Sequence, residues 1–158
     1  MTLSKHAKLA AAIALGLTTS AVAYASTMKP EDAITARRAV LRVIALNFGP
    51  LGAMAKGEIP FDVELFRTNA ARMVEVSRMP LLDYFPDGTD QDAGDVKTRA
   101  MPEIWLDMEK FENKLETMRQ EVAKLAEVAQ SGDEAAMKAQ VGTTGKACKS
   151  CHDDFRNK

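Results

Sequence analysis

The sequence predicts an all-α protein with the fold of an antiparallel up-down four-helix bundle. Proline and glycine residues divide the chain after residue 28 into four helical stretches, and the third stretch carries a long, regular seam of apolar residues. No segment alternates apolar and polar residues over a useful length, as a half-buried strand would. The 158 residues leave room for one domain with a real core and are too few to expect two.

The first 25 residues have the pattern of a secretory signal peptide. Lys5 and Lys8 form a positive n-region, the run from Leu9 to Leu17 is almost entirely apolar, and Ala23-Tyr24-Ala25 is an A-x-A cleavage pattern. The alternatives are an uncleaved membrane anchor and a buried helix, but a bilayer span needs about 20 apolar residues and this run is shorter. We therefore expect cleavage near Ala25 and an exported, periplasmic domain of residues 26–158.

The charge balance excludes some classes of partner. The whole chain has 21 Lys and Arg against 22 Asp and Glu, and removing Lys5 and Lys8 leaves 19 against 22, a net charge of −3. This composition gives no basic footprint for nucleic acid or anionic lipid, and we expect no later segment to enter a membrane. Removal of the leader also takes His6, so His152 is the single histidine of the mature chain.

The first helix is expected to begin at Pro30, a residue suited to the first helical position, with Glu31 and Asp32 complementing the helix dipole. Its apolar side consists of Ile34, Leu41, Ile44, Ala45 and Phe48. Gly49-Pro50 is expected to interrupt it, and the sequence leaves open whether the helix resumes as far as Lys56.

The second helix is expected over residues 62–79, ended by Pro80. Its inward residues are Leu65, Phe66, Met73 and Val76. Residues 80–101 then form a long connection that contains Pro86, Gly88 and Gly94, and connections of this length are usually functional or mobile.

The third helix is expected to begin at Pro102-Glu103 and has the clearest periodicity in the chain. Its seam is spaced 4-3-4-3-4-3-4 and consists of Ile104, Met108, Phe111, Leu115, Met118, Val122, Leu125 and Ala129. Ser131-Gly132 ends this helix, and Asp133 can cap the fourth. The fourth helix continues inward through Met137, Val141, Cys148, Cys151 and Phe155.

The motif Cys148-Lys149-Ser150-Cys151-His152 is C-x-x-C-H, the pattern of covalent c-type haem attachment. Positions i and i+3 lie on one face of a helix, so both thiols can add to the two vinyl groups along one haem edge. The next residue then brings its imidazole to the iron. We predict one haem c, bound through Cys148 and Cys151 with His152 as axial iron ligand, between the helices near the C-terminal helix.

Three other uses of the cysteine pair are less suited to this chain. A disulfide between Cys148 and Cys151 would close a very short loop and stabilise little. A thioredoxin-like redox pair is found in a strand–helix context, which this sequence lacks. A structural zinc site needs four Cys or His ligands, and the mature chain has three.

The second axial position of the iron is open from the residues alone. A second histidine is excluded by counting, but eight of the nine methionines lie at residue 28 or beyond. Methionine is a common filler of irregular core gaps, and no single one stands out as an iron ligand.

Residues spread along the chain are typical of one protein family. They are Lys29-Pro30-Glu31-Asp32-Ala33, Arg37 with Leu41 four residues on, Phe48-Gly49, Pro102-Glu103-Ile104-Trp105, and Cys148-x-x-Cys151-His152-x-x-x-Arg156. On these residues the chain resembles the class II c-type cytochromes and, within them, the cytochrome c prime (cytochrome c′) family. The resemblance covers essentially the whole mature chain.

The resemblance implies roles for several residues. Leu41 corresponds to the apolar residue over the open iron face of the high-spin, five-coordinate members, where the low-spin relatives place a methionine ligand. Arg37 and Arg156 correspond to arginines near the haem, although solvated helix-face charges are the alternative. An Arg fork suits a haem propionate, which Arg38 and Arg99 could also reach. The resemblance further implies a homodimer through the first two helices.

The function expected from these features is that of an exported, five-coordinate c-type haem protein that transfers electrons or binds small gases such as NO and CO. The rival in the binding class is a six-coordinate, Met-ligated low-spin electron carrier. The rival enzyme, a haem peroxidase or an NO-consuming catalyst, would lack a distal histidine for acid–base chemistry. We therefore do not expect an enzyme.

Overall fold

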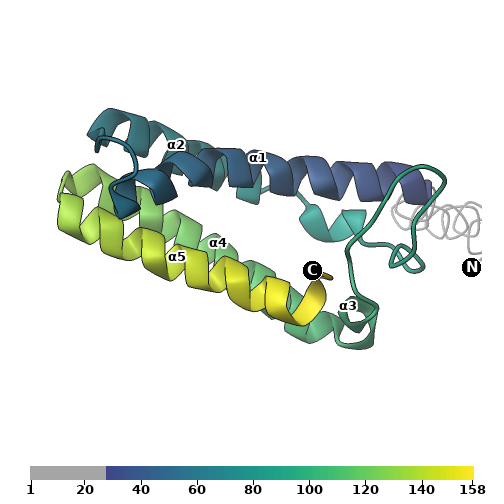
Figure 1. The fold of residues 1–158 in the computed structure, drawn as a ribbon. Coiled ribbons are helices and arrows are strands. Elements are labelled where there is room, and N and C mark those ends of the chain that lie inside the picture. Colours follow the sequence, from purple (N-terminus) through teal and green to yellow (C-terminus); the bar gives the residue numbers. More distant parts are fainter. Residues whose placement is uncertain (1–27) are drawn as a thin grey trace, which may run out of the picture.

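The computed structural model of the protein describes residues 28–158, so the predicted signal peptide, residues 1–25, lies outside the described residues. Within this range the chain is helical and has no named strand. Four long helices run up and down in sequence order, α1 and α2 as one antiparallel pair and α4 and α5 as the other (Figure 1). The predicted four-helix bundle is therefore confirmed.

Helix α1 (Pro30–Lys56) is longer than the sequence indicated, because Gly49-Pro50 does not interrupt it. Pro50 removes one backbone donor, but the helix goes on to bury Leu51 and Met54 completely. This burial offsets the lost hydrogen bond. The helix ends at Gly57, whose φ of 75° is the left-handed conformation that glycine adopts most easily at a helix end.

Helix α1 has an unusually exposed apolar surface. Among the helices of residues 28–158 it alone is long and apolar enough to cross a membrane by length and composition, which differs from the expectation that no segment after the leader could do so. Only 22 % of its most apolar stretch is buried within the chain. Val43 and Leu46 are 41 % and 56 % exposed.

Helix α2 (Val63–Ser77) begins where Asp62 accepts a hydrogen bond from the backbone N–H of Leu65 at 2.9 Å. Phe66 and Met73 are buried as expected, whereas the inward placement of Leu65 is wrong, since that side chain is 41 % exposed. A capping residue fixes the helix start, and Leu65 lies on the outer side of the first turn.

The third predicted helix is divided in two at Asp107. A short helix, α3 (Glu103–Leu106), precedes α4 (Met108–Ser131), and the Asp107 carboxylate caps α4 by accepting from the N–H of Lys110 at 3.1 Å. The apolar seam is confirmed on α4 from Phe111 to Ala129. Helix α5 (Glu134–Phe155) follows directly, capped by Asp133.

The connection between α2 and α3 packs against the end of the bundle. It begins with a 3₁₀ turn, η2 (Leu81–Tyr84), and brings the ring of Phe85 to 4.8 Å from that of Phe111. Its last residues pair with the segment after α5: Met101 N–H donates to Phe155 O at 3.0 Å, and Asn157 N–H donates to Arg99 O at 2.9 Å. The long connection is thus held at both of its ends.

Candidate haem-binding site

Cys148, Cys151 and His152 lie together on the last turns of α5. Both cysteines are free, partly buried thiols that pack against the core between the helices. Because they are three residues apart on a continuous helix, they share one face. The disulfide alternative is not formed.

Burial sets the protonation of these side chains. It raises the pKa of the Cys151 thiol to about 11 and raises the pKa of the Cys148 thiol as well, so both are protonated at neutral pH. Reactive redox pairs have lowered thiol pKa values, which this site does not provide. Burial lowers the pKa of His152, and the nearby charge of Arg156 lowers it further. The imidazole is therefore neutral, the form that binds iron.

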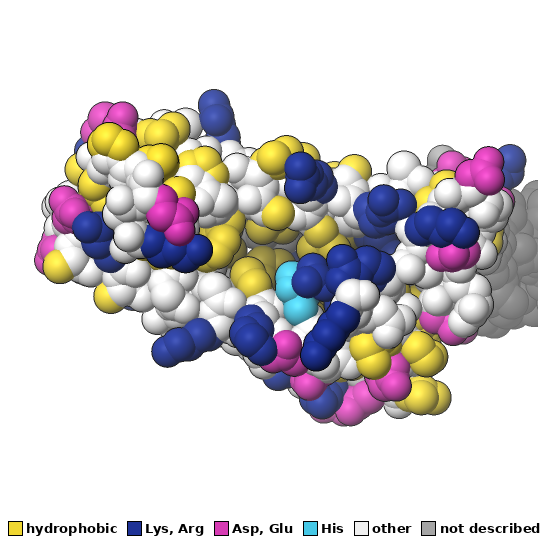
Figure 2. Space-filling model, in the orientation of Figure 1, with side chains coloured by type: hydrophobic (Ala, Val, Ile, Leu, Met, Phe, Trp, Pro, Cys, Tyr) yellow, Lys and Arg dark blue, Asp and Glu magenta, His cyan; other side chains and the backbone are white. Residues whose placement is uncertain are grey.

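His152 lies at the edge of a hollow of about 500 Å³. The hollow is lined by Arg99, His152, Asp153, Arg156, Asn157 and Lys158. Figure 2 shows His152 in cyan with basic side chains beside it and hydrophobic side chains in the adjoining space between the helices. Apolar side chains next to a basic rim suit a flat apolar ring that carries carboxylates.

The position of Leu41 follows from a contact between α1 and α5. A Cβ added at Gly145 would lie 3.6 Å from Cζ of Phe48, so the Phe48 ring packs on α5 at this glycine. The two helices run antiparallel (Figure 1). Leu41 is two turns before Phe48 and His152 is two turns after Gly145, so both lie about 10 Å from the contact in the same direction. Leu41 and His152 therefore lie at the same level of the bundle, on α1 and α5.

Gly145 and Gly142 do not break α5. The sequence Gly142-Thr143-Thr144-Gly145 is helical throughout. Nothing lies within 4 Å of a Cβ placed on Gly142, whereas a Cβ on Gly145 would make ordinary van der Waals contact with Phe48. Gly145 therefore marks a contact between α1 and α5.

The residues fit a covalently bound haem. Two inward thiols share one face of α5, a neutral imidazole lies beside them at the hollow, and Leu41 lies at the same level on α1. Within residues 28–158 there is no group of three or more His, Cys, Asp or Glu placed to hold a metal ion, which weighs against the zinc alternative.

Arg37 is held by the long connection. Its guanidinium is buried and donates to Thr89 Oγ1 at 2.6 Å, to Thr98 Oγ1 at 2.7 Å, to Tyr84 O at 3.2 Å, and to Thr89 O. Burial lowers its pKa to about 10, and the charge of Asp90 opposes this shift. Most of its donors are therefore taken by residues 84–98, and its predicted contact with a haem stays a prediction.

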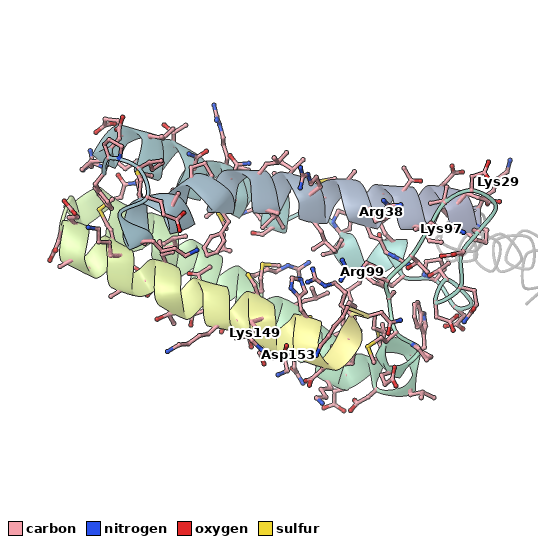
Figure 3. The ribbon with its side chains drawn as sticks, in the orientation of Figure 1. Lys29, Arg38, Lys97, Arg99, Lys149 and Asp153 are labelled. Atoms are coloured by element: carbon pink, nitrogen blue, oxygen red, sulfur yellow. The ribbon has the colours of Figure 1, made fainter. Side chains whose placement is uncertain are left out.

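The other predicted arginines are distributed around the hollow. Arg99 and Arg156 line it together with His152, and Arg99 Nε also donates to Asn157 O at 2.8 Å. Arg38 is exposed and donates to Lys97 O at 2.9 Å, on the connection. Figure 3 shows Arg99 between α1 and α5, with Arg38 and Lys97 beyond it. Arg99 and Arg156 are the arginines that the structure brings to His152.

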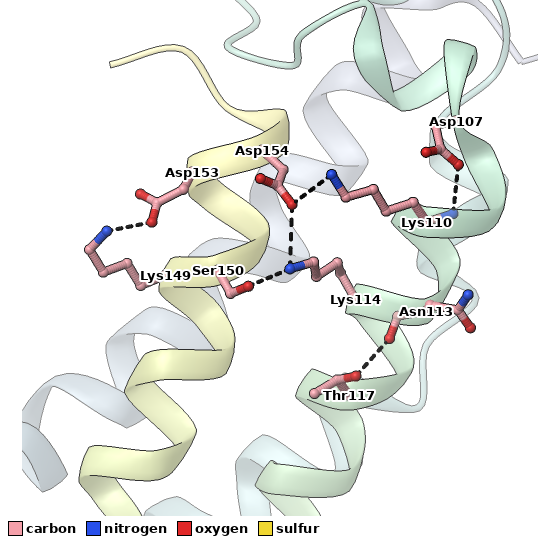
Figure 4. Close-up of polar contacts among 9 residues, drawn as sticks. All are labelled: Asp107, Lys110, Asn113, Lys114, Thr117, Lys149, Ser150, Asp153 and Asp154. Carbon is pink, nitrogen blue, oxygen red and sulfur yellow. Dashed lines mark hydrogen bonds and ion pairs between the residues drawn. The ribbon is translucent and has the colours of Figure 1, made fainter.

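The two middle residues of the motif point away from the core and fasten α5 to its surroundings (Figure 4). Lys114 Nζ on α4 bonds to Ser150 Oγ and lies 3.3 Å from the Asp154 carboxylate, which Lys110 also meets at 3.2 Å. Lys149 pairs with Asp153 on the same helix. Ser150 thus faces α4 and Lys149 faces solvent, while Cys148 and Cys151 pack against the core.

Sequence reasoning missed Thr89 and Thr98, which bind Arg37 from the connection. Thr89 is fully buried in a segment without periodicity. A threonine between Gly88 and Asp90 reads as part of a solvated turn, and no local pattern indicates its partner 52 residues away.

Comparisons with known proteins agree with the resemblance noted in the sequence. The model of the Cytochrome C′ family matches residues 32–156. The chain is 45 % identical over 130 residues to the cytochrome c′ of Halomonas halodenitrificans, covering 81 % of this chain and 98 % of that protein. It is 41 % identical to the cytochrome c′ of Rubrivivax gelatinosus, covering 82 % and 98 %.

Solved structures agree as well. The cytochrome c′ of Thermochromatium tepidum matches with a TM-score of 0.77 at 28 % identity, covering 83 % of this chain and 98 % of that one. A cytochrome c′ with ligand-controlled dimer dissociation has a TM-score of 0.77 at 31 % identity, with the same coverage. A ferrous variant of the Alcaligenes xylosoxidans protein with bound NO has a TM-score of 0.70 at 34 % identity, covering 82 % and 97 %.

Proposed function

Because this chain belongs to the cytochrome c′ family and binds haem c covalently, we propose that it is an exported, periplasmic, five-coordinate haem protein that transfers electrons, binds small gases such as NO and CO, or both. The observation that supports the five-coordinate assignment is that Leu41, an apolar residue without a donor atom, lies on α1 at the level of His152 on α5.

Each residue of the site has one task in this proposal. Cys148 and Cys151 hold the haem by thioether bonds, and His152 ligates the iron from one side. Arg99 and Arg156 lie where they can bind the propionates, with Arg38 farther along the connection. The bound haem supplies a one-electron iron couple and, with one axial position open, a binding site for small ligands.

The side chain of Leu41 decides which ligands the open position favours. It restricts access by its bulk and excludes water, but it offers no hydrogen-bond donor to a polar ligand. Such a pocket favours small neutral diatomic molecules over ligands that need a donor. The relative with bound NO supports this assignment.

The six-coordinate alternative requires a methionine sulfur opposite His152. In the proposal Leu41 takes that position, and the nearest methionine from it toward the end of α1, Met54, is thirteen residues farther, about 20 Å along the helix. Met54 and Met73 are also fully buried in the bundle core. The geometry therefore favours the five-coordinate form.

A catalytic role has less support than binding and electron transfer. Within residues 28–158 His152 is the one histidine, and it is assigned to the iron. Nothing on the Leu41 side supplies the acid–base group that peroxidase chemistry uses. We propose that the protein is not an enzyme.

The exposed apolar side of α1 supports a homodimer. Val43 and Leu46 lie on a different side of α1 from Leu41, and Leu65 on α2 is exposed as well. A second copy packed on α1 and α2 would cover these side chains. The relative described by its dimer dissociation shows that this fold can dimerise.

The experiment that tests the proposal is the visible spectrum of the purified holoprotein. A five-coordinate ferrous haem gives broad bands, and addition of CO shifts them. Sharp, split bands in the ferrous protein without added ligand would overturn the five-coordinate assignment. Haem that leaves the protein under acid–organic extraction would overturn the attachment through Cys148 and Cys151.

A further inference from the structure

One face of the molecule carries six basic side chains, of which four make no ion pair within residues 28–158. This basic face consists of Arg38, Lys97, Arg99, Lys149, Arg156 and Lys158, gathered around the hollow beside His152 (Figures 2 and 3). Elsewhere in residues 28–158 most basic side chains are paired with an acid, as Lys56 is with Glu58 and Arg67 with Glu64.

Within the basic face, ion pairs are few. Lys97 pairs with Asp92 at 3.0 Å, and Lys149 pairs with Asp153. Arg38, Arg99, Arg156 and Lys158 make no ion pair with any other residue in the part of the chain from 28 to 158; Arg38 and Arg99 use one donor each on backbone carbonyls. Asp92, Asp153 and the two propionates of a haem leave an excess of positive charge on this face.

The excess is local, because the mature chain as a whole is acidic, with 19 Lys and Arg against 22 Asp and Glu. A molecule with negative net charge and one positive face has a strong dipole. Such a dipole turns the positive face toward an acidic partner during diffusion and raises the association rate.

We propose that the basic face around the hollow is the docking surface for an acidic protein. The inference rests on the proposed function, since the haem held behind this face makes a one-electron carrier the fitting kind of partner. Arg38 and Lys158, which make no ion pair within residues 28–158, stay available when Arg99 and Arg156 bind propionates. Lys97 and Lys149 lie on the same face in their pairs with Asp92 and Asp153.

An anionic membrane is the other acidic surface that this face could meet. Membrane binding of a basic patch is strengthened by apolar side chains that insert beside it. The exposed apolar residues Val43, Leu46 and Leu65 do not belong to the basic face, and the overall charge of −3 repels an anionic bilayer at longer range. The observations therefore favour a protein.

The test uses the holoprotein and flavodoxin, an acidic one-electron carrier, as the probe, with affinity measured by isothermal titration calorimetry. The parent should bind at about 20 mM NaCl and lose affinity at about 200 mM, because salt screens exposed charges. The double variant Lys97→Glu with Lys158→Glu should weaken binding by about tenfold or more at low salt.

The matched control is Lys56→Glu with Lys124→Glu, which makes the same change in net charge. Lys56 is at the end of α1 remote from His152, and Lys124 is on α4. This control should weaken binding by less than about threefold, since it alters only the long-range charge. Equal losses in the two double variants, or no binding by the parent, would overturn the docking surface.

Two further measurements keep the result interpretable. Binding of the parent to phosphatidylglycerol vesicles but not to flavodoxin would overturn the proposal in favour of a membrane. The spectrum of every variant is recorded as well. A low-spin spectrum with intact flavodoxin binding would contradict the proposed function alone, whereas a five-coordinate spectrum without binding would contradict the docking surface alone.

Discussion

In the proposed function, Leu41 is the side chain that decides whether the second axial position of the iron stays open. Leu41→Ala should open the distal side and speed or tighten CO binding, because the leucine restricts access by bulk. Leu41→Met should place a thioether opposite His152 and move the spectrum toward the low-spin, six-coordinate form. Stopped-flow CO binding and visible spectra measure both effects.

Val43 provides the control for Leu41. It is similarly exposed, at 41 % against 37 %, but it points to another side of α1. Val43→Met should leave the spectrum and CO binding unchanged. Identical behaviour of Leu41→Met and Val43→Met would show that Leu41 is not the distal residue.

Arg37 is the residue that ties the long connection to α1. Arg37→Ala should lower the free energy of unfolding by about 2–4 kcal/mol, because Thr89 and the carbonyl oxygens around the guanidinium lose their buried donor. Arg37→Lys should rescue little, since one ammonium cannot reach the same acceptors as the planar fork. Denaturant unfolding of the holoprotein measures the loss.

Arg38 is the matched control for Arg37, one residue away on the same helix. Its one bond, to Lys97 O, comes from an exposed side chain. Arg38→Ala should change stability by less than about 1 kcal/mol. If Arg37→Ala costs no more than this, the connection is not held by Arg37.

At the level of the helix, two glycines are expected to change the stability in opposite directions when replaced by alanine. Gly142 is inside α5 with nothing within 4 Å of an added Cβ, so Gly142→Ala should stabilise the protein by up to about 1 kcal/mol. Gly132 ends α4 with a φ of 72°, so Gly132→Ala should destabilise it by about 1 kcal/mol. Thermal unfolding of the two variants compares them directly. A loss of stability in Gly142→Ala would mean that a group outside the polypeptide contacts this position.

The helices show where sequence patterns are sufficient and where they are not. The seam from Phe111 to Ala129 could be predicted, because periodic burial is a local property. The continuation of α1 past Pro50 could not be predicted. It is stabilised by the burial of Leu51 and Met54, which depends on other helices. The division at Asp107 was also missed, because an aspartate inside a periodic run reads equally well as a surface residue or a cap.

The site shows the same contrast. Cys148, Cys151 and His152 are adjacent in sequence, so their chemistry follows from their spacing alone. The partners of Arg37 are 47 to 61 residues away and have no shared motif. The basic face likewise could not be predicted from composition, because a net charge of −3 over residues 26–158 does not say where the charges lie in space.

For the whole molecule, the exposed apolar side of α1 leads to a prediction about assembly. Leu46 is 56 % exposed, and Leu46→Asp should convert the proposed homodimer to a monomer, because a charge would be buried without a partner at the interface. Leu106→Asp is the control, since this leucine is 82 % exposed on α3, away from α1 and α2. Sedimentation equilibrium distinguishes the two. A parent that sediments as a monomer would contradict the dimer outright.

The two ends of the bundle differ in the sequence separation of the residues that are in contact there. At one end, α1 joins α2 and α4 joins α5 through short turns. At the haem end, Arg37 reaches Thr98 across 61 residues and Arg99 reaches Asn157 across 58. Contacts that close such long loops form late in folding and open early in local unfolding. Amide hydrogen exchange should therefore be slowest near the short turns and fastest beside His152, so that the apoprotein remains accessible to haem at the end where it must enter.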